Sequence, residues 1–141
     1  MKEIEYQKKY VKRLVDTATE ILTDEDRDTG TIIFKAPTGS GKTYMVSQAM
    51  TQMVKENPNI AFAFIWISEN KLHEQSLNSL SRYFEDERLL ECLTNTELNN
   101  NTIEQNEIMF VNWESINKEN SLFRVDNEQN WNLQTVVKNT K

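Results

Sequence analysis

The chain has 141 residues, enough for about one domain that buries roughly two-thirds of its unfolded surface. Its net charge of -6 gives no overall attraction for nucleic acid, so any such binding must depend on a local basic patch. A single cysteine excludes an internal disulfide, and the lack of an apolar leader or of a stretch of about 20 apolar residues predicts a cytoplasmic protein without a membrane span.

The first predicted element is an amphipathic helix over residues 3 to 22, because apolar side chains recur there with a helical period. These side chains are Ile4, Tyr10, Val11, Leu14, Val15, Ala18, Ile21 and Leu22. An acidic turn at residues 23 to 30 follows, with charges expected to be solvated. It leads into an apolar run at residues 31 to 35, which predicts the first strand.

A phosphate-binding loop follows this strand. Residues 36 to 43 read APTGSGKT, and the motif requires a strand before it and a helix after it, predicted here at residues 32 to 34 and 44 to 54. The strict pattern has glycine in place of Ala36, and helicase-like loops commonly differ in this way. The alternative, a simple turn with a solvated lysine, is disfavoured because every motif position has the right spacing.

The residue types of the loop suit a nucleoside triphosphate with Mg²⁺. Gly39 and Gly41 let the backbone approach the phosphates, and the amides from Gly39 to Thr43 form an anion-binding concavity at the positive end of the next helix. Lys42 adds a charge for the β and γ phosphates, and Thr43 offers the hydroxyl for the metal, so both are predicted to be catalytic. Ser40 is expected to cap the helix. The predicted nucleotide contacts of the loop are Thr38, Gly39, Ser40, Gly41, Lys42 and Thr43.

The rest of the chain alternates between strands and helices, as α/β proteins with a parallel sheet do. Residues 60 to 67 are unbroken in apolarity, which predicts a strand buried on both faces and covered by helices. Residues 71 to 84 predict a helix and residues 107 to 111 a third strand, while residues 89 to 93 are apolar but uncertain in type. The weaker predictions are a loop at 97 to 105, a turn or short helix at 112 to 116, a loop at 118 to 130 and the start of a helix at 131 to 139.

Three further segments complete a set of motifs. They are Glu-Tyr-Gln at residues 5 to 7, SENKLHEQ at residues 68 to 75 and FVNWESI at residues 110 to 116. With the phosphate loop they resemble the first motor domain of superfamily 2 helicases and translocases, most closely the restriction subunit of type III restriction enzymes. The resemblance covers nearly the whole chain and implies a RecA-like P-loop NTPase fold, ATP and Mg²⁺ as cofactors, double-stranded DNA as substrate and a methyltransferase subunit as partner.

The resemblance also implies a role for each segment. Gln7 corresponds to the glutamine that reads adenine, for which a neutral amide offers both a donor and an acceptor, although a plain surface residue is the alternative. Asn70, Lys71 and Gln75 are expected to contact the DNA backbone. Many family members have arginine in place of Asn70, which leaves open a capped helix with nothing bound.

The segment at the end of the third strand supplies the remaining expected DNA contacts. Asn112 and Trp113 are expected to meet a nucleic acid backbone or base, because an exposed aromatic side chain stacks on bases. A buried tryptophan that only fills the core is the alternative.

Hydrolysis in this class needs an Asp-Glu pair at the end of a strand. Asp24-Glu25 and Glu85-Asp86-Glu87 are acidic but follow no apolar strand. Residues 1 to 141 are therefore expected to form one truncated helicase ATP-binding domain that binds ATP without useful hydrolysis. The resemblance also implies that the strands flanking residues 31 to 36 lie beyond residue 141. This predicts an empty slot in the sheet and therefore low stability, an altered sheet or strand exchange between copies.

Two other functions stay open at this point. A small P-loop kinase begins with the same motif, but it needs an arginine-rich lid, and here a whole helix precedes the loop and only five arginines occur. A catalytically silent nucleotide-binding or interaction module is the other. Adenine nucleotide affinity, measured with and without DNA, would separate these functions from the DNA-dependent ATPase.

Overall fold

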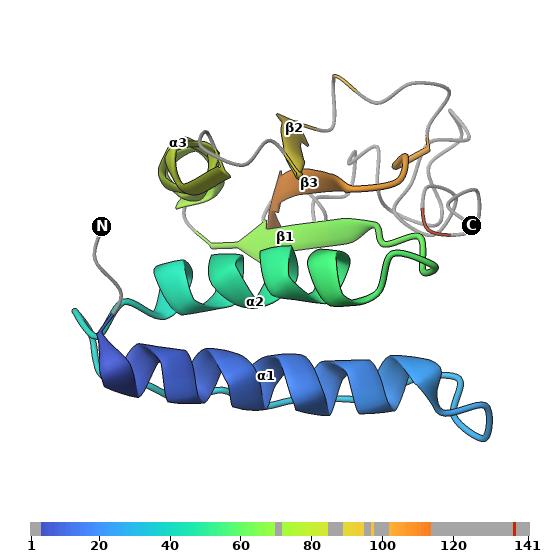
Figure 1. The fold of residues 1–141 in the computed structure, drawn as a ribbon. Helices are drawn as coiled ribbons and strands as arrows, with labels where there is room; N and C mark the ends of the chain where they lie inside the picture. The colour runs from blue at the N-terminus through green and yellow to red at the C-terminus, as the bar shows by residue number, and fades with distance from the viewer. Residues whose placement is uncertain are drawn as a thin grey trace. The chain divides into compact units, whose positions relative to one another are not determined.

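The structure is a computed structural model. It describes residues 4–69, 72–84, 89–94, 97, 102–113 and 137. The chain forms two compact units, Met1–Asn59 and Ile60–Lys141, and each is described by itself (Figure 1). In chain order the elements are α1 (Glu5–Thr23), α2 (Lys42–Glu56), β1 (Phe64–Ser68), α3 (Leu72–Phe84), β2 (Glu91–Thr94) and β3 (Glu107–Asn112).

The first unit consists of α1, α2 and the segment that joins them. Figure 1 shows the two helices side by side, with the joining segment running back along α1. The buried residues of α1 are Gln7, Val11 and Val15, each four positions from the next, so they form one stripe on the helix. The predicted leading helix is confirmed, and its buried stripe carries a glutamine at the amino end in addition to the expected valines.

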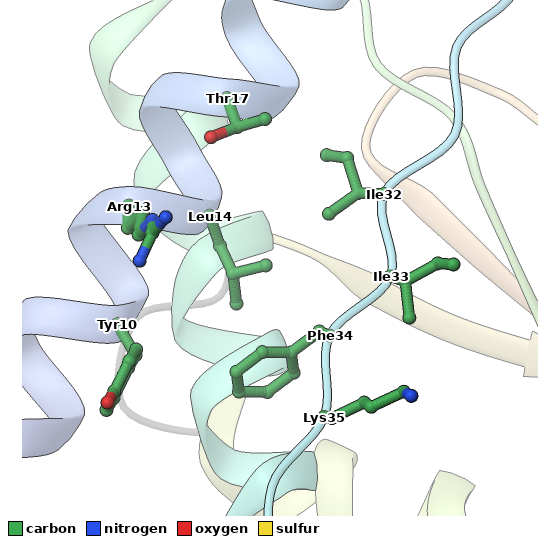
Figure 2. A pocket seen from close by; sticks show the side chains of 8 residues that line it. All are labelled: Tyr10, Arg13, Leu14, Thr17, Ile32, Ile33, Phe34 and Lys35. Atoms are coloured by element: carbon green, nitrogen blue, oxygen red, sulfur yellow. The ribbon is translucent and has the colours of Figure 1, made fainter.

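Residues 31 to 36 do not form the predicted strand. Figure 2 shows an extended trace in which Ile32 and Phe34 point toward α1 while Ile33 and Lys35 point away from it. Ile33 is 78% exposed, and no hydrogen bond joins the backbone of residues 31 to 36 to any other described residue. The period of the side chains is that of a strand, but a strand also needs a neighbouring strand with which to exchange hydrogen bonds.

The second unit contains a three-stranded parallel sheet with the order β1-β3-β2 (Figure 1). Trp66 on β1 pairs with Phe110 on β3, and Leu93 on β2 pairs with Met109 on β3. The predicted parallel α/β architecture is therefore confirmed, and the apolar piece of uncertain type, residues 89 to 93, contributes most of β2. Helix α3 lies against this sheet.

Burial in the sheet depends on strand position. Central strand β3 carries four almost completely buried side chains, Ile108, Met109, Phe110 and Val111. Strand β1 was predicted to be buried on both faces, yet it is half-buried, with Ile67 45% exposed. The prediction is wrong for β1 because this strand stands at an edge of the described sheet, where it has one strand neighbour.

The backbone of Asn106, just before β3, hydrogen bonds with residues at or near the beginnings of β1 and β2. Its backbone N–H donates to the Phe62 carbonyl oxygen at 2.7 Å, and its own carbonyl oxygen accepts from the Glu91 N–H at 2.9 Å. Asn106 has φ of 64°, a left-handed conformation that asparagine adopts more readily than most residues. Residues 105 and 106 thus form a specific turn before β3.

Several predictions fall outside the described residues. They concern residues 98 to 101 of the loop predicted at 97 to 105, the part of residues 112 to 116 after Trp113, residues 118 to 130, and residues 131 to 139 apart from Val137.

The contrast between β3 and β1 gives a prediction for stability. Ile108 is fully buried and Ile67 is 45% exposed, so the same change at the two positions should have different costs. Ile108→Ala is expected to lower the free energy of unfolding by about 2 to 5 kcal/mol. Ile67→Ala should lower it by about 1 kcal/mol, because water already covers much of the side chain. Urea unfolding followed by circular dichroism measures both, and equal losses would contradict the described burial.

Candidate nucleotide-binding site

The phosphate loop is a backbone turn built around two glycines. Gly39 and Gly41 have φ of 83° and 86°, in the left-handed region that glycine adopts without a steric penalty. Between them, the Ser40 N–H and hydroxyl both donate to the Pro37 carbonyl oxygen, at 3.1 and 2.6 Å. The loop therefore owes its shape to two left-handed residues and to local hydrogen bonds.

The loop leads directly into the amino terminus of α2. The helix begins at Lys42, with Gly41 at the N-cap and no side-chain hydrogen bond to cap it. Ser40 was expected to cap the helix, and that prediction is wrong because its hydroxyl is used within the loop. The first turn of α2 carries no acidic residue. Its N–H groups and the positive end of the helix dipole therefore suit an anion.

The two glycines are required for different reasons. A Cβ atom built on Gly39 would have no heavy atom within 4 Å, so the space beside this residue is open to a ligand. A Cβ atom on Gly41 would lie 2.5 Å from the Gln7 side-chain nitrogen. Gly39 thus provides access to the loop, and Gly41 allows close packing of the loop on α1.

Gln7 joins α1 to the loop. Its side chain is buried, 4% exposed, and its Nε2 donates to the Ser40 carbonyl oxygen at 3.1 Å. Its Oε1 accepts from the Ile4 N–H at 3.1 Å, which fixes the orientation of the carboxamide. The alternative of an unconstrained surface glutamine does not hold. Gln7 lies beside the phosphate loop and contacts its backbone.

Tyr6 is a member of this site that the sequence analysis did not single out. Its hydroxyl donates to the same Ser40 carbonyl oxygen, at 2.9 Å. The residue precedes Gln7 in the motif, but a tyrosine at a helix start carries no signal of a contact 34 positions away. Its place in the motif was the available clue.

Lys42 and Thr43 occupy the first turn of α2. Lys42 is exposed and Thr43 is half-buried, while Thr38 is exposed on the loop. Within the described ranges, no side chain pairs with the Lys42 ammonium group or the Thr43 hydroxyl. These are the cation and the hydroxyl that could meet a phosphate and its metal. No three histidine, cysteine, aspartate or glutamate side chains group together among the described residues to form a separate metal site.

A groove with a cavity volume of about 350 Å³ lies between α1 and residues 32 to 35 (Figure 2). Tyr10, Arg13, Leu14 and Thr17 line it on the helix side. None of the residues 36 to 43 contributes to its lining, so this groove is separate from the phosphate loop.

The predicted DNA contacts lie in the second unit or outside the described residues. Asn70 and Lys71 are outside, and Gln75 is exposed on α3. Asn112 is buried at the carboxyl end of β3, where its register partner is Ser68 at the end of β1. Trp113 follows it and is 49% exposed, so the alternative of a buried core tryptophan is wrong.

The single cysteine has no place in this chemistry. Burial raises the pKa of the Cys92 thiol, a hydrogen bond with Ser81 lowers it, and the nearby Glu91 carboxylate raises it again. The net effect is upward, so the thiol stays protonated at neutral pH and is a poor nucleophile.

Comparison with known proteins places the motifs in one family. The sequence model of the family described as "Type III restriction enzyme, res subunit" matches residues 1–139. A search of curated proteins and a search of solved structures each found no match. The described part of the chain contains no helix with the length and apolarity of a membrane span. The matched region contains the phosphate loop, Gln7 and Trp113.

The packing of Gly41 against Gln7 can be tested with two alanine variants. Both glycines have positive φ, so alanine at either should cost about 1 to 2 kcal/mol of stability. Gly41→Ala should cost about 1 kcal/mol more than Gly39→Ala, because the new methyl group displaces the Gln7 carboxamide from the Ser40 carbonyl.

The matched control is the same pair of variants in a Gln7→Ala background, where the clashing atom is absent. Urea unfolding of all four proteins measures the difference. An excess cost at Gly41 that persists in the Gln7→Ala background would show that Gln7 is not its cause.

Proposed function

Because the chain belongs to the res subunit family of type III restriction enzymes, we propose that it is the ATP-binding part of a DNA-dependent ATPase that translocates on DNA. The observation that carries the proposal is the loop of residues 36 to 43. It places two left-handed glycines and a lysine at the uncapped amino terminus of a helix. Backbone amides in this arrangement bind phosphate groups.

Different residues of the loop are proposed to contact different parts of Mg²⁺-ATP. The backbone from Thr38 to Gly41 surrounds the phosphates, and the open space at Gly39 admits them. Lys42 neutralises charge on the β and γ phosphates, while the Thr43 hydroxyl is a ligand of the metal ion. When bound there, the metal ion would supply positive charge that offsets the charge of the phosphates.

Gln7 is proposed to read the adenine base. Its carboxamide is fixed beside the loop and offers one donor and one acceptor, as the adenine edge requires. Each group uses one hydrogen-bonding position, with Ser40 and Ile4, and retains a second N–H or lone pair for adenine.

DNA contact is proposed at the carboxyl ends of the parallel strands and the start of α3. Ligands of open parallel sheets bind at this edge. Trp113 is exposed there, and Gln75 is exposed on α3. We include Asn112, Asn70 and Lys71 in the proposed contact on the basis of the family motif. The proposed assembly in the cytoplasm joins double-stranded DNA and a methyltransferase subunit.

The proposal concerns binding rather than turnover. Hydrolysis in this class needs an Asp-Glu pair at a strand end, and none of β1, β2 and β3 is followed by such a pair. No residue of the described sheet is therefore assigned that role.

Lys42→Ala is expected to weaken Mg²⁺-ATP binding about 10- to 100-fold, the effect of losing a hydrogen bond between charged groups. Lys35→Ala is the matched control, since Lys35 is also exposed but points away from α1 before the loop begins (Figure 2). Isothermal titration calorimetry with the three proteins measures the affinities. Equal affinities for the wild type and Lys42→Ala would refute nucleotide binding at this loop.

Trp113→Ala is expected to weaken binding of a single-stranded oligonucleotide by about 1 to 3 kcal/mol, the contribution of stacking on one aromatic side chain. Trp113→Phe should retain most of the affinity because its ring still stacks. Fluorescence anisotropy of a labelled oligonucleotide at fixed salt compares the two. If Trp113→Ala binds as tightly as the wild type, this tryptophan does not stack on a base of single-stranded DNA.

A further inference from the structure

Two side chains from the start of α1 meet at one backbone oxygen of the phosphate loop. The Ser40 carbonyl oxygen accepts from the Tyr6 hydroxyl at 2.9 Å and from Gln7 Nε2 at 3.1 Å. A carbonyl oxygen has two lone pairs, so these two donors saturate it. Ser40 lies between the two left-handed glycines, where the backbone is least restricted.

The orientation of this peptide group decides where one of the loop amides points. The Ser40 carbonyl and the Gly41 N–H belong to the same planar trans peptide and therefore point in opposite directions. Donors that hold the oxygen toward α1 thus hold the Gly41 N–H away from α1. With glycines on both sides, this peptide could otherwise rotate, and an amide needed for phosphate would be lost from the concavity.

The two donors differ in what else they do. Gln7 is buried and is the proposed reader of adenine, so its Nε2 would have to serve both the base and Ser40. Tyr6 is 42% exposed, and among the described residues its hydroxyl bonds only with Ser40. Its hydrogen bond is independent of the base.

We propose that Tyr6 is a positioning residue that fixes the Ser40–Gly41 peptide of the phosphate loop and keeps it fixed when the Gln7 carboxamide contacts adenine. Its effect on affinity rests on the proposed ATP binding, whereas the hydrogen bond itself is a feature of the fold. Tyr6 thereby positions an amide that binds phosphate, and Gln7 contacts the adenine base.

The sequence permits a direct test in the whole chain. Of the three glycines, only Gly41 follows a serine. Labelling with carbonyl-¹³C serine and ¹⁵N glycine therefore yields one carbonyl-to-amide NMR correlation, that of the peptide whose oxygen Tyr6 contacts. Gly30, visible through ¹⁵N alone and outside the loop, serves as the internal reference.

Tyr6→Phe removes the hydroxyl and keeps the ring, and it should shift the Ser40–Gly41 signal while the Gly30 signal stays in place. Tyr10→Phe is the matched control, because Tyr10 lies on the same helix, is 41% exposed and hydrogen bonds with no described residue. Its Ser40–Gly41 signal should match that of the wild type. An unmoved Ser40–Gly41 signal in Tyr6→Phe overturns the proposal, whether or not the chain binds ATP.

Nucleotide affinity then tests the consequence. Tyr6→Phe should weaken binding of Mg²⁺-ATP and of inorganic tripolyphosphate by the same factor, about three-fold, as for one partly exposed hydrogen bond. Gln7→Ala should weaken ATP more than tripolyphosphate, which has no base. A Tyr6→Phe loss confined to ATP would assign Tyr6 to the base, and an unchanged affinity for both ligands would refute its role in binding. If the wild-type chain binds neither ligand, the proposed function fails, while the NMR comparison still decides on the contact.

Discussion

The hydrogen bonds at the Ser40 carbonyl oxygen hold together the parts of the first unit that matter for function. A phosphate loop must leave amides available for phosphate, although here the Ser40 N–H donates to Pro37, and must still keep a backbone turn that only glycines adopt easily. Local hydrogen bonds to Pro37 close the turn, but they do not attach it to the rest of the fold. Tyr6 and Gln7 provide that attachment, from a helix more than 30 positions earlier in the chain.

This attachment explains the composition of α1. Its buried stripe begins with Gln7 and continues with Val11 and Val15, so the packing of the valines also places the glutamine. The carboxamide is satisfied at both ends, which offsets the cost of burying a polar group. Gly41 completes the fit because any larger residue would collide with Gln7. The same contacts therefore stabilise the first unit and shape its candidate site.

The sequence predicted the features that depend on local pattern. The loop, α1, α2, β3 and the parallel arrangement of the sheet all followed from motif spacing and apolar period. The strand predicted at residues 32 to 34 failed, because a strand exists only through its partners, and Ile33 remains exposed. The role of Tyr6 was also beyond prediction, since it depends on a contact between distant parts of the chain. The half-buried state of β1 depended in the same way on its position at the edge.

The loop of residues 36 to 43 is proposed to bind a nucleoside triphosphate. A titration of the ¹⁵N-glycine-labelled chain with Mg²⁺-ATP examines this binding at the loop itself, because the chain has three glycines and two of them lie in the loop. Binding is expected to give saturable shifts of the Gly39 and Gly41 signals, with the Gly30 signal unmoved. Loop signals that stay in place at millimolar Mg²⁺-ATP, or that move no more than Gly30, would contradict it.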